Sequence, residues 1–210
     1  MTELLAPNPE FATVAPVERL DAAAAALRGN GIEALVVGSG AEARQAVLDR
    51  LPDGAEVFNN TSRTLETIGI AEDIERSGRY RAVRLELYQM DREMQKREMR
   101  KLAAAPDHVV GSVHALTEGG SLIIASASGS QLGPIASGAG RVILVVGGQK
   151  LVPDLETGLR RVREYCYPLE NERALGTYGV PSGVNNVLVV NRVLSPGRVT
   201  AILVREPLGF

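Results

Sequence analysis

The residues of this chain that are best suited to chemistry gather between positions 114 and 150. At the start of this stretch, His114 and Thr117-Glu118 are followed by Gly119-Gly120-Ser121. An imidazole titrates near neutral pH, and a glutamate can serve as a base or as a nucleophile. The pattern predicts Glu118 and His114 as catalytic candidates, with Thr117, Gly120 and Ser121 beside them for ligand binding. A solvated turn explains the same residues.

A run of small residues follows at 125–140, where twelve of sixteen residues are Ala, Ser or Gly. Small side chains let a backbone approach a ligand closely, and successive N–H groups with hydroxyls can hold a phosphate or a carboxylate. Ser128, Ser130 and Gln131 are therefore candidate ligand-binding residues, and Lys150 is a candidate partner for an anion. Tight helix–sheet packing is the alternative. The run has neither a Walker Gly-Lys-Ser/Thr nor the G-x-S-x-G of serine hydrolases.

Two earlier turns have a similar character. Segment 59–64, Asn-Asn-Thr-Ser-Arg-Thr, opens a predicted helix. Ser62, Arg63 and Thr64 could hold an anion there, or they could be ordinary caps. Segment 38–43 matches the loose G-x-G-x-x-A form of a dinucleotide fingerprint, but no acid ends the next strand to bind a ribose. A tight strand-to-helix turn is the favoured interpretation there, and no cofactor is predicted.

Short apolar runs that alternate with helical segments must position these residues. The clearest strands are expected at 121–125 and 142–146, and further strands at 32–37, 55–58, 187–190 and 199–204. Helices are expected at 17–28, 41–51, 87–105, 153–165 and 167–178. This order predicts an α/β fold with a mostly parallel sheet flanked by helices, and the close spacing of the last two strands predicts an antiparallel edge. Ligands bind beyond the carboxyl ends of such strands. The loops after Val37, Phe58, Val113, Ala125 and Val146 are therefore the places to examine.

Composition excludes several classes of function. The chain has 210 residues, 23 Lys+Arg against 25 Asp+Glu, 4% aromatic residues and no Trp, which argues against nucleic-acid binding. Cys166 is the only cysteine, and the two histidines lack an HExxH spacing, so no metal site is predicted. A lone thiol and the absence of a signal peptide favour the cytoplasm. The uncharged stretch 119–140 contains Gln131 and Pro134 and is no membrane span.

The expected domain organisation is simple. The start of the chain contains three prolines, Pro7, Pro9 and Pro16, and this pattern predicts a flexible arm over 1–15. Residues 16–210 are expected to form one domain, with homo-oligomerisation possible.

Two segments carry a family resemblance. They are His-Ala-Leu-Thr-Glu-Gly-Gly-Ser-Leu-Ile-Ile-Ala-Ser-Ala-Ser-Gly-Ser-Gln at 114–131 and Arg-Val-Ile-Leu-Val-Val-Gly-Gly-Gln-Lys-Leu-Val-Pro-Asp at 141–154. Together with 62–70, 168–173 and 198–210, they resemble the LUD (lactate utilization) domain family, which includes lactate-utilization protein C. The resemblance spans roughly residue 32 to the C-terminus. It implies a fold similar to sugar-phosphate isomerases, CoA transferases and formyltetrahydrofolate cyclo-ligase.

The resemblance also implies a role in bacterial oxidation of lactate to pyruvate beside iron–sulfur subunits. The family's acid-x-Gly-hydroxyl pattern matches Glu118, Gly120 and Ser121, and its Ser-Gln pair matches Ser130 and Gln131. His-Ala-Leu-Thr-Glu replaces the more usual Ala-Asp-Thr-Gly style, which is consistent with a side branch that has a different ligand. The chain also lacks the cysteine-rich extension of the iron–sulfur member.

Three hypotheses follow. The first is an accessory subunit of a lactate-oxidising system that binds a small carboxylate or phosphorylated ligand. The alternative is a stand-alone enzyme that acts on a CoA thioester, folate or sugar phosphate through Glu118. The third is a regulatory or scaffolding domain with a vestigial pocket.

Overall fold

The computed structural model describes residues 6–210, and its largest element is a six-stranded parallel sheet. The strand order is β1-β10-β7-β4-β2-β3. The strands are β1 Glu33–Val37, β2 Glu56–Asn59, β3 Arg81–Ala82, β4 His108–Ser112, β7 Arg141–Gly147 and β10 Val199–Val204. All five strand pairings are parallel. The predicted α/β fold with a mostly parallel sheet is confirmed.

A second sheet of four strands packs against one face of the first. Its order is β8-β5-β6-β9, with bounds β5 Ala115–Thr117, β6 Leu122–Ser126, β8 Leu151–Val152 and β9 Asn186–Val190. Leu122 and Ile124 of β6 join the core cluster that also contains Val142 and Leu144 of β7. Because side chains alternate along a strand, Ile123 of β6 faces the opposite way, into a separate cluster.

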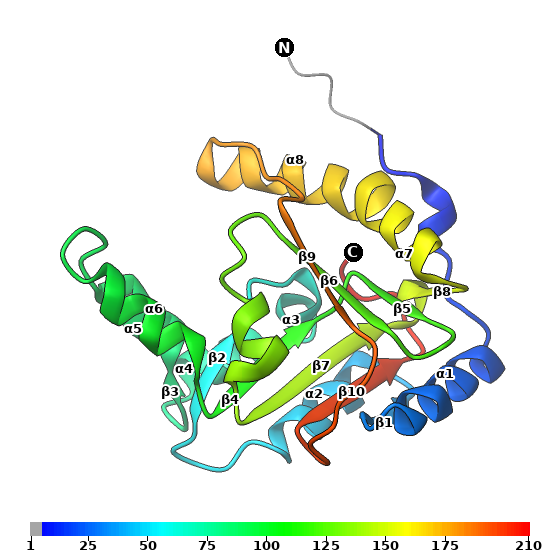
Figure 1. Ribbon diagram of the computed structural model, residues 1–210, viewed down its shortest axis with the longest axis horizontal. Helices are drawn as coiled ribbons and strands as arrows, with labels where there is room; N and C mark the ends of the chain where they lie inside the picture. The colour runs from blue at the N-terminus through cyan, green and yellow to red at the C-terminus, as the bar shows by residue number, and fades with distance from the viewer. Residues whose placement is uncertain (1–5) are drawn as a thin grey trace.

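Eight α-helices lie within residues 6–210, and most of them pack on the two sheets. They are α1 Val17–Gly29, α2 Gly40–Leu48, α3 Arg63–Thr67, α4 Ile70–Arg76, α5 Val83–Gln89, α6 Lys96–Ala104, α7 Leu155–Arg161 and α8 Tyr167–Tyr178. Helices α2 to α4 pack on one face of the large sheet, whose core includes Ile143 and Val145. Helix α1 packs on the other face, and α7 covers the outer face of the small sheet (Figure 1). The molecule therefore has four layers: helices α2 to α4, the large sheet, the small sheet and helix α7.

The last two strands do not form the predicted antiparallel edge. Strand β10 lies between β1 and β7 inside the large sheet, parallel to both, and β9 pairs with β6 in the small sheet. Burial explains the difference. All six residues of β10 are buried, as a central parallel strand requires, whereas Asn186 and Val187 of β9 are exposed. The connection over 191–198 therefore crosses from one sheet to the other.

The predicted long helix over 87–105 is also interrupted. Helix α5 ends at Gln89 and α6 begins at Lys96, so the chain forms a helical pair that stands at one edge of the molecule (Figure 1). Between them, the Asp91 carboxylate accepts the backbone N–H groups of Glu93 (2.7 Å) and Met94 (3.0 Å). An aspartate that caps a new turn competes with helix continuation, and this overrides the helical spacing.

The end of α7 continues into α8 through a π-helical turn at Val162–Cys166. The proline at 168 has no N–H to donate back along the helix, and irregular helical geometry is typical near prolines and at π-bulges. Insertions of this kind are common at functional sites. Val162 and Cys166 both line the cavity described below.

Part of the predicted N-terminal arm is docked in the structure. The backbone N–H of Asn8 donates to Glu164 O at 2.8 Å, and that of Ala15 donates to Gly148 O at 3.1 Å. Phe11 is buried between them. Residues 1–5 of the predicted arm lie outside the described residues. No helix within 6–210 has both the length and the apolar character needed to cross a membrane.

Candidate functional site

A cavity of about 280 Å³ lies at the carboxyl ends of β2, β4 and β7. Its walls come from the loops that begin at Asn60, Val113 and Ser126, from Lys150, and from the π turn with α8. Because β2, β4 and β7 are neighbours in the sheet, they deliver Asn60, Ser112 and Lys150 to one wall, although these residues are far apart in sequence. Four of the five loops expected at the ligand-binding edge meet here.

The loop after Val37, the fifth, does not line this cavity. The Gly40 N–H donates to Glu206 Oε2 at 2.9 Å, and the Gly38 N–H donates to Glu42 Oε2 at 2.9 Å. These carboxylates occupy the backbone donors that a dinucleotide pyrophosphate would use. The geometry fits the favoured interpretation of 38–43 as a tight turn.

Lys150 is the most unusual group of the cavity, because its amine is buried without an acidic partner. Its exposed fraction is 1%. Nζ donates to Thr64 Oγ1 and to Ser112 Oγ, both at 2.9 Å. Burial, with the nearby Arg161 cation, lowers the pKa of Lys150 to about 7. Lys150 takes part in none of the ion pairs found within residues 6–210.

A second basic group, Arg161, is buried behind Cys166. Its guanidinium donates to the backbone carbonyls of His114 and Phe11 and to Cys166 Sγ, the last at 3.0 Å. Among residues 6–210, no carboxylate forms an ion pair with it, and its Nε has no hydrogen-bond partner. Burial lowers the pKa of Arg161 and raises that of the Cys166 thiol. Lys150 on the cavity wall and Arg161 behind it are therefore two buried basic groups that form no ion pair with an acid among residues 6–210.

His114 lines the cavity in its neutral form. The Ala125 N–H donates to His114 Nδ1 at 3.1 Å, so the proton of the imidazole resides on Nε2. Burial and the charges of Lys150 and Arg161 lower the pKa of His114 to about 3. At neutral pH this residue can donate a hydrogen bond from Nε2, but it is not poised to exchange a proton.

Asn60 presents a buried amide that nothing satisfies. Its exposed fraction is 4%, and neither Nδ2 nor Oδ1 has a hydrogen-bond partner in the described part of the chain. The side chain packs against Gly111 of β4, where an added Cβ would lie 2.6 Å from Asn60 Nδ2. A buried amide without partners is rare and costly. One that lines a cavity is ready to hydrogen-bond with a ligand.

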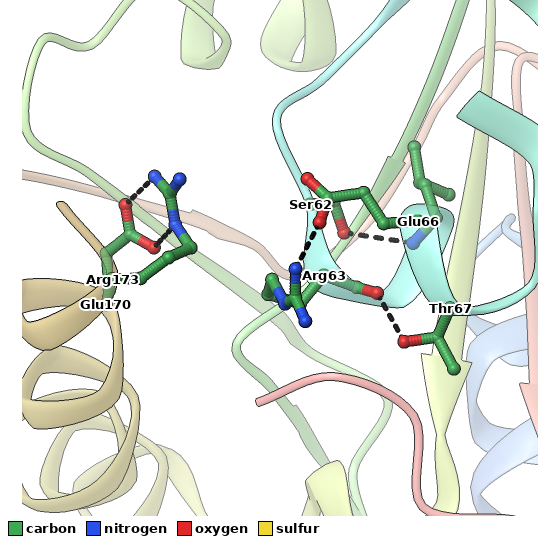
Figure 2. A network of polar contacts seen from close by, with 7 residues as sticks. Ser62, Arg63, Glu66, Thr67, Glu170 and Arg173 are labelled. Atoms are coloured by element: carbon green, nitrogen blue, oxygen red, sulfur yellow. Dashed lines mark hydrogen bonds and ion pairs between the residues drawn. The ribbon is translucent and has the colours of Figure 1, made fainter. Parts of the chain in front are cut away.

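Two arginines on the other walls are already paired. Arg63 of α3 forms an ion pair with Glu66 at 2.6 Å, and Arg173 of α8 forms a bidentate pair with Glu170 at 2.7 Å (Figure 2). The hydrogen bonds that Arg173 donates to the Glu170 carboxylate raise the pKa of Arg173. Ser62 caps α3 by accepting the Leu65 N–H at 3.5 Å (Figure 2). These groups surround the cavity with donors without adding net charge.

The small-residue run supplies the remaining polar wall. Ser128 Oγ and Ser130 Oγ lie 3.0 Å apart, within hydrogen-bond distance. Gln131 Nε2 donates to Ala125 O at 3.1 Å, and this hydrogen bond does not use Gln131 Oε1. Among the predicted site residues, those that line the cavity are Ser62, Arg63, His114, Ser128, Ser130, Gln131 and Lys150. Thr64 lies directly beneath them, because its hydroxyl contacts Lys150 Nζ.

The other predicted residues lie elsewhere. Glu118 is exposed at the turn between β5 and β6, where it pairs with Arg19 of α1 at 2.7 Å. Thr117 and Gly120 form that turn, and Ser121 donates to Asn191 Oδ1 at 2.9 Å. Strand β5 carries the chain away from the cavity, so His114 at its start lines the cavity and Glu118 beyond its end does not.

Sequence reasoning missed several cavity residues, including Asn60, Ser112, Cys166, Glu170 and Arg173. Asn60 stood in the Asn-Asn-Thr-Ser segment directly after a predicted strand, and that position was a usable signal. Nothing local marked Arg161 or Cys166, since their place follows from the packing of α7 on the small sheet. Within the described part of the chain, no group of three or more His, Cys, Asp or Glu is arranged to hold a metal ion.

Comparisons with known proteins agree with this architecture. The LUD domain family model matches residues 20–204, so the chain belongs to the LUD domain family. A crystal structure of a DUF162 family protein from Deinococcus radiodurans aligns with a TM-score of 0.57 at 15% identity, covering 91% of this chain and 99% of the other. At that identity, the likeness shows the fold alone. No curated protein matches the chain.

Proposed function

We propose that the protein binds a small anionic ligand, a carboxylate or a phosphorylated compound, in the cavity beneath α8. The observation that carries this proposal is one wall on which Lys150 is buried with no acidic partner and Asn60 is buried with no hydrogen-bond partner. An anion would supply both missing partners at once. Buried charged and polar groups are normally paired, so the ligand is the natural completion of this wall.

The size and lining of the cavity support a small ligand. A volume of about 280 Å³ is just below the range typical of small-molecule sites, ~300–1,000 Å³. The hydroxyls of Ser62, Ser128 and Ser130 offer further donors around it. A glutamate nucleophile at Glu118, as in the alternative of a CoA, folate or sugar-phosphate enzyme, gains no support from an exposed side chain that pairs with Arg19.

Membership of the LUD domain family supports a role associated with lactate utilization in general. Within that role, we propose an accessory subunit that works beside iron–sulfur proteins, because a chain with one cysteine cannot hold a cluster through thiolates alone. Affinity purification of the tagged protein from lactate-grown cells tests this part. Recovery of iron–sulfur subunits is expected, and their absence from a cross-linked preparation would count against it.

Thermal unfolding with added anions tests the binding site itself. Lactate, pyruvate and inorganic phosphate are compared at pH 7. A ligand at a hundred times its Kd stabilises by about 2.7 kcal/mol, and about 2–4 °C per kcal/mol is expected for a chain of this length. The shift should vanish in Lys150→Met and Asn60→Leu and persist in Lys101→Met, which changes an exposed lysine. Equal shifts in all four proteins would refute the assignment.

A further inference from the structure

The hydrogen bonds around Lys150 Nζ define the state of its amine. The Thr64 hydroxyl can donate to Leu208 O at 3.1 Å, and the Ser112 hydroxyl can donate to Val145 O at 2.7 Å. With their protons so used, each hydroxyl offers a lone pair to Nζ at 2.9 Å. A neutral amine has two N–H groups, so it satisfies both acceptors and keeps its own lone pair free. A protonated amine would have a third N–H that no group in the described structure accepts.

The charged and titratable groups that face the amine of Lys150 also favour its neutral form. Arg161, on α7, repels a proton on Nζ, and His114 is neutral. Cys166 on the π turn is the one neighbour whose charge would favour the ammonium form, but burial keeps it as a thiol. Lys150 itself lines the cavity. The structure thus combines a desolvated amine, a free lone pair and room for a small molecule, which is the arrangement that makes a lysine nucleophilic.

We propose, building on the anion site proposed above, that the ligand is a small aldehyde or ketone with an anionic group, such as a 2-oxo acid, and that Lys150 condenses with its carbonyl. The lone pair of Nζ attacks the carbonyl carbon, and the C=O π pair moves to oxygen, which takes a proton from the newly bonded, positively charged nitrogen to give a neutral carbinolamine. The carbinolamine then loses its hydroxyl, with one further proton, as water. In total, amine, carbonyl compound and one proton give a protonated imine and one water, with no change in oxidation state.

The anionic group of the ligand stabilises the protonated imine in the site. A protonated imine places a positive charge where the protein has buried a neutral amine. The ligand's carboxylate, hydrogen-bonded to the Asn60 amide, lies beside that charge and compensates it. A ketone without an anionic group would leave the charge buried and unpaired, which is strongly unfavourable. The proposal therefore predicts selectivity for 2-oxo acids over neutral ketones such as acetone.

Reductive trapping tests the proposal directly, with pyruvate as the probe and sodium cyanoborohydride as the trapping hydride donor. The chain has only Lys96, Lys101 and Lys150, so two exposed lysines serve as internal controls. At pH 7, an amine with a pKa of about 7 is half unprotonated, on the order of a thousandfold more than an ordinary exposed lysine. Peptide mapping should find one carboxyethyl group on Lys150, at least roughly tenfold above either other lysine. Acetone should label far less.

Three variants separate the possible failures. Lys150→Arg should lose the adduct while it retains a pyruvate-dependent thermal shift, because it keeps the charge but not the nucleophilic amine. Asn60→Leu should lower labelling at limiting pyruvate, and Lys101→Arg should leave it unchanged. A pyruvate-dependent shift of the unmodified protein without an adduct on Lys150 would overturn the imine and leave the anion site intact. Neither a shift nor an adduct would overturn both, and equal labelling of all three lysines would overturn the imine.

Discussion

Replacement of Lys150 by methionine should make the protein more stable at pH 7. Folding holds the pKa of this amine at about 7 instead of the ordinary 10.5. At pH 7 or below, that difference costs the folded state about 5 kcal/mol at most, at about 1.4 kcal/mol per pH unit. Methionine has a similar length and no charge. It loses the two hydrogen bonds to Thr64 and Ser112, each worth about 1 kcal/mol. We therefore expect a net gain of about 2–3 kcal/mol.

The contribution of Lys150 to the free energy of unfolding depends on pH. The folded-state pKa is lowered, so the unfolded chain binds the proton over the interval from pH 7 to 10.5 and the folded chain does not. Stability should therefore rise with pH above 7, by about 1 kcal/mol between pH 7 and 8. The advantage of Lys150→Met should shrink by the same amount. Cys166 and His114 contribute little in this interval, because burial moves the first pKa up and the second far down.

Urea unfolding at pH 7.0, 7.5 and 8.0 measures both quantities, with Lys101→Met as the exposed control. The control should follow the unmodified protein within about 0.5 kcal/mol at each pH. A Lys150→Met protein that is less stable than the unmodified one at pH 7, with a difference that does not change with pH, would refute the claim that Lys150 is a buried amine of lowered pKa.

Three further predictions concern other parts of the site. Gly111→Ala places a Cβ within 2.6 Å of Asn60 Nδ2, so it should destabilise the protein by about 1–3 kcal/mol and weaken anion binding, as calorimetry would show. Because burial lowers the pKa of His114 to about 3, the unfolded chain takes up a proton below pH 6.5 that the folded chain refuses; stability should fall as pH drops from 6.5 toward 3, and His114→Gln should flatten that fall in urea unfolding. Glu118→Gln should cost less than about 1 kcal/mol and leave anion affinity unchanged, since its partner Arg19 lies outside the cavity; a large loss of affinity would contradict the site described here.

Local sequence patterns predict most strands and helices of the fold but only some of the residues of the site. Strand β10 was predicted with its observed bounds, because an uninterrupted apolar run is a strong signal. Its place in the middle of the large sheet was not predictable from spacing, since β9 precedes it closely yet belongs to the other sheet. Partner choice between strands depends on the burial of whole faces, and the local sequence does not encode that.

The same reasoning explains why Glu118 was grouped with His114. Three residues separate them in the chain, and all three form β5, which runs away from the cavity. Proximity in sequence therefore became distance in space. Asn60 and Lys150 show the reverse case, because β2, β4 and β7 lie side by side and bring residues from three distant segments to one edge. A site at the ends of parallel strands is built from such distant positions.

The chemistry of the cavity wall argues that it is built for a ligand. A core that served stability alone would fill the positions of Lys150, Arg161 and Asn60 with apolar side chains, since replacing buried ionic groups by well-packed hydrophobic ones is often stabilising. Within residues 6–210, the protein instead buries two basic groups without acids and one amide without partners beside the cavity at the carboxyl edge of the large sheet. An anion that enters the cavity would give these buried groups the charge and hydrogen-bond partners that they lack. Binding should therefore stabilise the fold and, where Lys150 remains an amine, raise its pKa so that a proton is taken up with the ligand near pH 8.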